Sequence, residues 1–276
     1  MFERKNVMTN KGMAKDTLAI LEKRAYKNRE GNIVNISKNL DNCIKNTVYY
    51  SSEKLEELIE KQVIDSKFET VFEVVKSTTL SAILKIVETE DSNKVMCLNF
   101  ASAKNPGGGF MSGAEAQEES LARTSALYSS QLQARVFYDT HRNMKSCIYT
   151  DAMIYSPQTP VFRKDRGELL NQPVDCNFIT SAAVNAGVIK RQEPELEKEI
   201  EAVMRRRIDK MLALSLSKGN EVLVLGAWGC GVFRNDSQMI ASLFKEHLRG
   251  KYKGAFKKII FAIYTKNEDL LKTFEM

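Results

Sequence analysis

Residues 95–109 read Val-Met-Cys-Leu-Asn-Phe-Ala-Ser-Ala-Lys-Asn-Pro-Gly-Gly-Gly. The first six residues, Val95 to Phe100, form a near-continuous apolar run whose length is typical of a strand buried on both faces of a sheet. The rest is a glycine-rich loop that leaves the end of this strand. In open α/β sheets, ligands bind beyond the carboxyl ends of the strands, so the loop is a candidate binding segment.

Strands and helices alternate on either side of this stretch, which predicts an α/β sandwich with helices on both faces of a mixed, mostly parallel sheet. Helices are predicted over 78–87 and over 194–214, where apolar residues recur at helical spacing. Further strands are predicted over 71–75, 147–154, 177–183, 222–225 and 259–264.

The N-terminal part has a different character. A helix is predicted over 13–27, followed by a break at Glu30-Gly31-Asn32 and by short helices and loops to about residue 65. We therefore distinguish an N-terminal part, residues 1–68, from the α/β part, residues 69–276.

Composition excludes several classes of protein. Of the 276 residues, 43% are hydrophobic and 28% are charged, which argues against a disordered chain. No apolar run approaches the roughly 20 residues that cross a bilayer, and the first residues do not resemble a secretory signal, so we expect an intracellular protein without a membrane partner. Five cysteines without a CxxC pair and only two histidines predict reduced thiols and no metal site.

The net charge of +6 is compatible with a polyanionic partner but is a weak signal. The basic residues are scattered, and their densest cluster, Arg205-Arg206-Arg207, lies in the long predicted helix. We interpret this cluster as solvated surface rather than as a nucleic-acid patch.

The glycine-rich loop has the chemistry of an anion cradle. Gly107, Gly108 and Gly109 lack the Cβ atoms that would keep a ligand away, and they can adopt positive φ, so successive N–H groups can face one phosphate or ribose. Gln117-Glu118-Glu119 follows at the junction with a predicted helix. Acidic residues there are favoured by the helix dipole alone, which is the structural alternative to catalysis.

Two adjacent carboxylates beside a nucleotide-binding loop can nevertheless divide acid and base roles. One can stay ionised while the other keeps a proton for a leaving group. General acid catalysis of glycosidic bond cleavage requires such a proton.

A second glycine-rich loop, residues 226–236, follows the strand predicted at 222–225. Its Gly229-Cys230-Gly231 resembles the start of a dinucleotide fingerprint, but Arg234 occupies the place of the last glycine, and no Walker A motif is present. The loop still offers N–H donors for a diphosphate, and Phe233 could stack on a ribose or base.

Other reactive side chains lack the partners of a nucleophilic site. No histidine lies near Cys230 in sequence, so we interpret this thiol as filler. We expect His141 and His247 to be surface or packing residues.

Together these residues resemble the microbial-type poly(ADP-ribose) glycohydrolase family, whose hallmark is a triple glycine, a short spacer and Gln-Glu-Glu. The spacer here, residues 110–116, has seven residues. After residue 183 the family commonly has an alanine-proline step, whereas this chain has Val184-Asn185. The similarity extends over residues 14–18, 99–102, 105–106, 119–125, 226–236 and 256–263.

The resemblance implies a macrodomain, a three-layer α/β/α sandwich that binds ADP-ribose without a metal or cofactor. It implies that residues 69–276 form this catalytic domain and that residues 1–68 are a helical extension packed on it. It implies that Glu119 is the catalytic acid and base, that Glu118 orients the ribose beside the scissile bond, and that Gln117 supports this pair. It implies two sets of substrate-binding residues: Asn105 with Gly107, Gly108 and Gly109 for the distal ribose and a phosphate, and Gly229, Cys230, Gly231, Val232 and Phe233 for the diphosphate and proximal ribose.

The expected reaction is cleavage of ribose–ribose bonds in poly(ADP-ribose), with ADP-ribose as product and a monomeric enzyme. Two alternatives use the same loops. One is hydrolysis of a single ADP-ribose from a protein side chain or nucleic-acid base, and the other is a reader that binds ADP-ribose without cutting it. The adjacent Glu118 and Glu119 argue against a reader, which needs no acid there.

Overall fold

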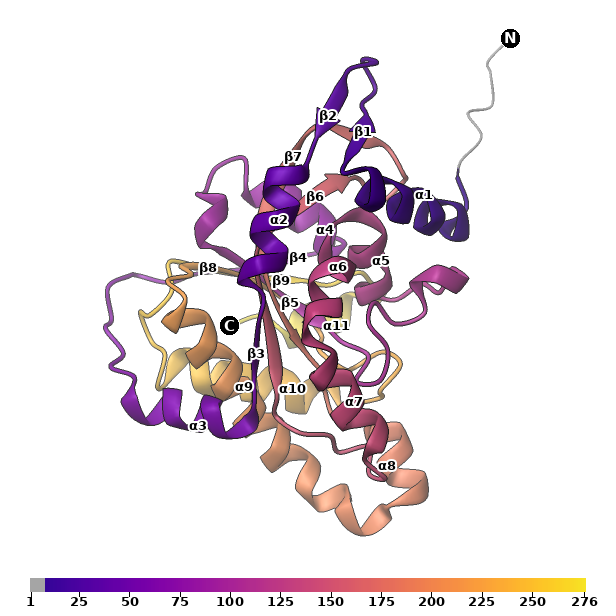
Figure 1. Ribbon diagram of the computed structural model, residues 1–276. Helices are drawn as coiled ribbons and strands as arrows, with labels where there is room; N and C mark the ends of the chain where they lie inside the picture. Colours follow the sequence, from indigo (N-terminus) through magenta and orange to yellow (C-terminus); the bar gives the residue numbers. More distant parts are fainter. Residues whose placement is uncertain (1–7) are drawn as a thin grey trace.

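The computed structural model describes residues 8–276, and its centre is a seven-stranded sheet (Figure 1). The strand order is β3-β6-β7-β5-β8-β9-β4, with parallel pairing from β7 through β4 and antiparallel pairing at β3–β6 and β6–β7. The predicted mixed, mostly parallel sheet is therefore confirmed. Its strands are β3 (Val48–Tyr50), β4 (Val71–Val75), β5 (Val95–Phe100), β6 (Met153–Arg163), β7 (Leu169–Ser181), β8 (Val222–Leu225) and β9 (Lys258–Ala262).

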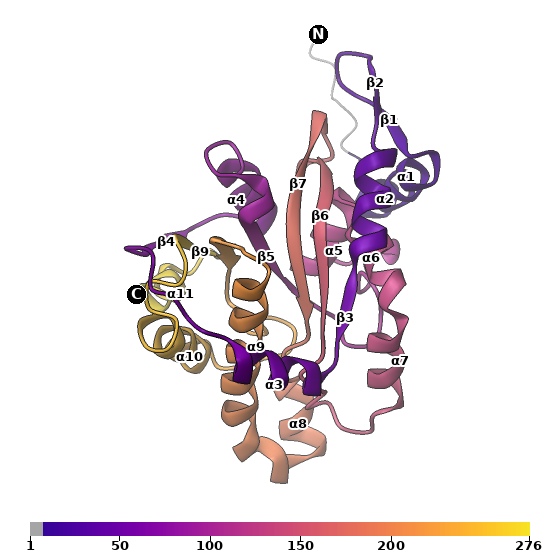
Figure 2. The ribbon, with the colours of Figure 1, turned by 60° about the vertical axis from the view of Figure 1, so that its left-hand side comes forward.

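Helices cover both faces of this sheet, as Figure 2 shows for α9 and α10 on one side and α5 and α6 on the other. The α/β sandwich is thus confirmed. The helices after the N-terminal part are α4 (Thr79–Ile86), α5 (Gln117–Thr124), α6 (Leu127–Gln131), α7 (Arg135–Asn143), α8 (Ala186–Gln192), α9 (Ile200–Ser217), α10 (Ser237–Arg249) and α11 (Glu268–Thr273).

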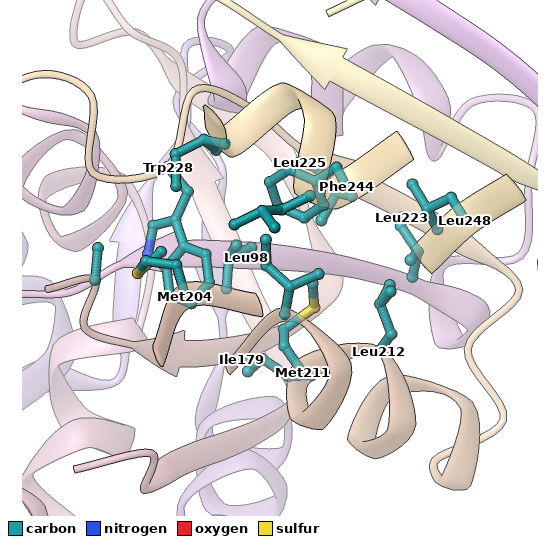
Figure 3. Packing of buried hydrophobic residues seen from close by; sticks show 14 of the residues in the cluster. Leu98, Ile179, Met204, Met211, Leu212, Leu223, Leu225, Trp228, Phe244 and Leu248 are labelled. Atoms are coloured by element: carbon teal, nitrogen blue, oxygen red, sulfur yellow. The ribbon is translucent and has the colours of Figure 1, made fainter. Parts of the chain in front are cut away.

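Strand β5 separates the two apolar layers because successive side chains alternate between its faces. Cys97 packs in a cluster with Leu121 of α5, whereas Leu98 packs with Met204 of α9 and Phe244 of α10. Figure 3 shows this second layer. Every residue from Val95 to Asn99 is buried, which explains why the sequence has a continuous rather than an alternating apolar run.

The N-terminal part differs from the prediction. Helix α1 (Asn10–Lys23) ends four residues early, because Arg24 adopts a left-handed conformation with φ of 56° and the chain enters a hairpin of β1 (Ala25–Lys27) and β2 (Ile33–Asn35). Such three-residue strands are too short to show an alternating pattern in the sequence.

Two further helices, α2 (Ser37–Asn46) and α3 (Ser52–Lys61), match the predicted short helices, but β3 between them was missed. Strand β3 pairs with β6 at the edge of the central sheet, and Leu55 of α3 is fully buried in the layer of α9. The part before residue 69 is therefore not entirely helical. The division at residues 68 and 69 stays a prediction.

Two predicted strands are displaced along the chain. Strand β6 begins at Met153 rather than at 147 and continues to Arg163, through an irregularity between Ser156 and Thr159. Strand β7 begins at Leu169, eight residues before the prediction. The two strands form a long hairpin whose distal half lies beside the β1–β2 hairpin, where Asn28 Nδ2 donates to Asn171 O. The distal half of the hairpin contains polar residues, so it has no continuous apolar run by which the sequence would predict a strand.

The basic cluster in α9 is only partly at the surface. Arg207 is fully buried, and its Nε donates to Asp151 at 3.1 Å, while Lys210 Nζ donates to the same carboxylate at 2.9 Å. Arg206 Nε also reaches Asp151, at 2.6 Å. The interpretation of Arg207 as solvated surface was wrong, since this residue belongs to an internal ionic network.

Asp151 carries the compensating charge of that network. Burial raises the pKa of its carboxyl, but Arg207, Arg206 and Lys210 together lower this pKa to about 2. Arg207 also donates to the carbonyl oxygens of Ala182, at 2.8 Å, and Ile148, at 3.1 Å, so the network fixes the segment after β7 to the segment before β6.

Over residues 8–276, no helix is long and apolar enough to span a membrane. The same residues include no cluster of three or more histidine, cysteine, aspartate or glutamate side chains placed to hold a metal ion. All five cysteines are unpaired thiols, as predicted.

Replacing Asp151 by Asn should lower the free energy of unfolding by about 3–5 kcal/mol, because it leaves the buried Arg207 without a counter-charge and the buried Lys210 with only the exposed Glu56 carboxylate. The matched control is Asp139→Asn, which breaks an exposed pair with Arg142 and should cost less than about 1 kcal/mol. Urea denaturation at neutral pH measures both. Equal, small effects would show that the buried network contributes little.

Candidate active site

Three loops leave neighbouring parallel strands β7, β5 and β8 at their carboxyl ends and pack against one another. A Cβ atom on Gly226 would lie 2.7 Å from the carbonyl oxygen of Ala262 and 3.1 Å from Cζ of Phe100. A Cβ on Gly229 would lie 2.5 Å from that of Ala183. Glycine is therefore required at both positions for close approach, and the two glycine-rich loops are brought to the same edge of the sheet.

Gln117 ties the start of α5 to the end of β5. Strand β8 pairs with β5 only as far as Cys97. Beyond that point the Gln117 side chain takes over, with Nε2 donating to Leu98 O at 2.8 Å and Oε1 accepting from Phe100 N at 2.9 Å. Gln117 thus supports the adjacent carboxylates through the backbone of β5.

Glu118 is 2% exposed, and protein donors surround its carboxyl group. Oε1 accepts from Asn99 Nδ2 at 3.1 Å and from Gln131 Nε2 at 2.8 Å, and Oε2 accepts from Ser102 N at 2.6 Å. These donors come from β5, from α6 and from the glycine-rich loop. The orientation of the carboxyl group is therefore determined by three separate segments.

Burial and these donors have opposite effects on Glu118. Burial is the larger effect and raises the pKa of the carboxyl to about 8, while the hydrogen bonds from Ser102, Asn99 and Gln131 lower it and the nearby Glu119 raises it. Glu118 therefore takes up or releases its proton within the pH range in which enzymes work.

Glu119 is half-buried and points at the glycine-rich loop. Its Oε1 accepts from Gly109 N at 2.9 Å. Gly108 has a φ of +57°, and a Cβ atom there would overlap Glu119 Oε1 and lie 3.2 Å from Glu118 Oε2. Both the backbone conformation and the space at Gly108 require glycine, because the carboxyl groups occupy the volume of a side chain.

The rest of the first loop is anchored on both sides. Gly107 has a φ of +66°, and the next residue with a large side chain, Phe110, is fully buried against Ala122 and near Tyr128. Asn105 is exposed, and its carbonyl oxygen accepts from Gly108 N at 3.0 Å. The loop thus presents the Asn105 side chain to solvent beside the three glycines.

The second loop is clamped by Asn235, whose Nδ2 donates to Val184 O at 2.8 Å and to Gly229 O at 3.1 Å. Within the described part of the chain, the N–H groups of Gly231, Val232 and Phe233 have no acceptor. Gly231 faces open space, and Val232 is 78% exposed. Three consecutive N–H groups are therefore available to an anion.

The other reactive or aromatic side chains that the sequence singled out lie in or near these loops or in the core. Burial raises the pKa of the Cys230 thiol to about 12, so the group is not a thiolate nucleophile. Phe233 lies 6.3 Å from Tyr149, between ring centroids. His141 is fully buried in an edge contact with Phe137, and burial lowers its pKa to about 4. His247 Nε2 lies 3.0 Å from Arg205 O. Both histidines are packing residues.

Sequence reasoning did not single out three groups around Glu118: the Asn99 side chain, the Ser102 backbone and the Gln131 side chain. Asn99 had a visible signal, because it is a polar residue within a buried apolar strand. Gln131 had none, since a glutamine near the end of a short helix is ordinarily exposed.

A sequence model described as "Microbial-type PARG, catalytic domain" matches residues 14–164. The chain belongs to this family. PARG denotes poly(ADP-ribose) glycohydrolase, so the predicted family, the macrodomain-like fold and the enzyme class, a glycosidase, are confirmed. A sequence search of curated proteins found no match.

Solved PARG structures are similar over nearly the whole chain. One is the poly(ADP-ribose) glycohydrolase from Thermomonospora curvata, 39% identical, covering 96% of this chain and 97% of that chain, with a TM-score of 0.91. The same enzyme bound to the inhibitor ADP-HPD has a TM-score of 0.89. PARG from Deinococcus radiodurans in complex with ADP-ribose is 41% identical, covers 85% of this chain and 95% of that chain, and has a TM-score of 0.80.

The buried Glu118 of this PARG family member should make its stability depend on pH. The folded protein keeps the Glu118 proton up to about pH 8, whereas the unfolded chain releases it near pH 4.5. The folded state therefore binds more protons over this interval, and the contribution of Glu118 to stability is lost as pH rises.

Glu118→Gln removes this titration, so the Tm of the variant relative to wild type should increase between pH 5 and pH 8. The differential effect on unfolding free energy should be on the order of a few kcal/mol. Thermal unfolding of both proteins across this range measures it. Parallel Tm curves would show that the Glu118 proton is not linked to folding.

Proposed function

We propose that the chain hydrolyses the ribose–ribose O-glycosidic bonds of poly(ADP-ribose) as a monomer and releases ADP-ribose, with Glu119 as the catalytic acid and base. The observation that carries these roles is the placement of the Glu119 carboxyl. One oxygen is held by Gly109 N–H, while within residues 8–276 the other oxygen has no hydrogen-bond donor. That oxygen is available to a substrate at the edge of the sheet.

Glu118 is less suited to proton transfer with a substrate. Both of its oxygens already accept hydrogen bonds from the protein, and its side chain is almost completely buried. A general acid must come within hydrogen-bond reach of the leaving oxygen. The Oε2 atom of Glu118, however, accepts only one hydrogen bond, from Ser102 N, and so keeps a lone pair with which Glu118 can hold a ribose hydroxyl group beside the bond that breaks.

The proposed reaction needs one carboxyl group in two protonation states. Protonated Glu119 gives its proton to the departing ribose hydroxyl as the C–O bond breaks and the anomeric carbon becomes oxocarbenium-like. The resulting carboxylate then takes a proton from water, whose oxygen bonds to the anomeric carbon. The products are ADP-ribose and a chain shorter by one unit, and Glu119 regains its initial proton.

The two loops supply the binding energy. In this proposal the N–H groups of Gly231, Val232 and Phe233 hold the diphosphate, and the side chain of Asn105 holds the distal ribose. The substrate's own diphosphate can stabilise the developing positive charge, so a second carboxylate nucleophile is not needed. The N-terminus of α5 favours anionic groups at the same place.

Glu119→Gln should reduce ADP-ribose release by a factor of about 10³ or more, because the amide cannot donate a proton and recover it, while ADP-ribose affinity stays near wild type. Release from poly(ADP-ribose) and calorimetric binding measure the two quantities.

Retained turnover in the variant would remove Glu119 from the mechanism. If wild type binds ADP-ribose without shortening the polymer, substrates with a single ADP-ribose on a protein side chain or a nucleic-acid base are tested next. Intact mono(ADP-ribosyl) substrates would then indicate a reader.

Gly108→Ala should abolish turnover, since the added methyl group displaces the Glu119 carboxyl. The matched control is Gly219→Ala, at a similar φ of +72° but with no atom within 4 Å of the new Cβ. Both variants carry the strain of a left-handed alanine, about 1 kcal/mol. Near-wild-type turnover in Gly108→Ala would show that the loop need not approach Glu119 closely.

A further inference from the structure

Gln131 is a buried polar residue whose only side-chain hydrogen bond within the described chain is to Glu118. Its Nε2 donates to Glu118 Oε1 at 2.8 Å, a shorter distance than the 3.1 Å from Asn99 Nδ2 to the same oxygen. The Gln131 side chain is fully buried, and its Oε1 has no protein partner in residues 8–276. Burying an amide oxygen without a partner costs free energy, and the hydrogen bond from Nε2 to Glu118 is the side-chain contact that opposes this cost.

The element that carries Gln131 is itself held in place. Ser130 Oγ donates to Ser156 Oγ of β6 at 2.7 Å, and Ala126 N donates to Pro160 O at 2.9 Å. Leu127 is fully buried among residues of the sheet. Helix α6 therefore presents the Gln131 amide from a fixed position, which preorganises its contact with Glu118.

An amide N–H can only donate, so it stabilises a carboxylate more than a carboxylic acid. We propose that Gln131 is a positioning residue for the hydrolysis reaction: its N–H fixes the rotation of the Glu118 carboxyl group and favours the ionised form of that group when ribose binds. The inference rests on the proposed function, in which Glu118 holds the ribose hydroxyl groups.

Two other titratable groups interact with Glu118. Glu119 lies on the same helix and raises the pKa of Glu118, and the buried Tyr138 of α7 is affected by the Glu118 charge in turn. Neither supplies a positive charge. The ionised form of Glu118 therefore depends on its three N–H donors, of which Gln131 and Asn99 are side chains that can be replaced.

The test measures ADP-ribose affinity by calorimetry between pH 5 and pH 9.5 for wild type, Gln131→Met, Gln133→Met and Glu118→Gln. Methionine preserves the length of the glutamine side chain without the donor. Gln133 is exposed, two residues away, and does not contact Glu118. Wild type should gain affinity as Glu118 ionises, and Glu118→Gln should lack this step.

In Gln131→Met the midpoint of the step should move up by about one pH unit, which corresponds to the loss of one hydrogen bond to a charged group. Affinity at the alkaline end should return to within about threefold of wild type. Gln133→Met should match wild type throughout. Should Gln131→Met fail to fold, Gln131→Leu, which also lacks the donor and carries no charge, should move the midpoint in the same direction.

A uniform loss of affinity at every pH would assign Gln131 a packing role only and overturn the inference. An unchanged midpoint in Gln131→Met, with the step absent in Glu118→Gln, would overturn it while leaving the role of Glu118 in place. A step that persists in Glu118→Gln would instead contradict the proposed role of Glu118.

Discussion

The site depends on how the first turn of α5 is joined to the end of β5. Strand β5 continues beyond the last residue that pairs with β8. The Gln117 amide bonds to the backbone groups left unpaired there, donating to Leu98 O and accepting from Phe100 N. These bonds fix the first turn of α5 and therefore the directions of the Glu118 and Glu119 side chains. Glu118 enters the protein and meets donors from three segments, while Glu119 faces the glycine-rich loop. Two consecutive carboxyl groups thereby acquire different environments, which is the physical basis for different roles.

Residues with strong local constraints could be interpreted from the sequence alone. The buried strand β5 was predicted with its observed bounds, and the glycines that require positive φ or close approach marked both loops. The features that were missed depend on partners distant in sequence. Strand β3 is visible only once β6 lies beside it, and Gln131 becomes part of the site only because α6 is packed on the sheet. Arginine is ordinarily a surface residue, and only the contact with Asp151, distant in sequence, explains why Arg207 is buried.

Buried charge is used in two ways in this protein. Around Asp151 the opposite charges are present inside the fold, so the carboxyl group remains ionised to low pH. Around Glu118 only neutral N–H donors are available, and the carboxyl group has a raised pKa. The first arrangement joins segments of the fold, because Arg207 also donates to carbonyl oxygens in the segment after β7 and in the segment before β6. The second leaves a group whose charge responds to its surroundings, as functional sites often do.

The strand order also has a consequence for how the chain is made. Strand β4, near residue 71, pairs only with β9, near residue 258. Strand β5 can pair with β7 once residue 181 has been added, but its second neighbour, β8, is complete only at residue 225. During synthesis from the N-terminus, three of the six strand pairings, those that involve β8 and β9, therefore wait for the last quarter of the chain. Such non-local pairing is intrinsically slow and leaves strand edges exposed in the meantime. A ribosome-bound intermediate would thus carry the first glycine-rich loop and both glutamates well before it held the second loop, which follows β8.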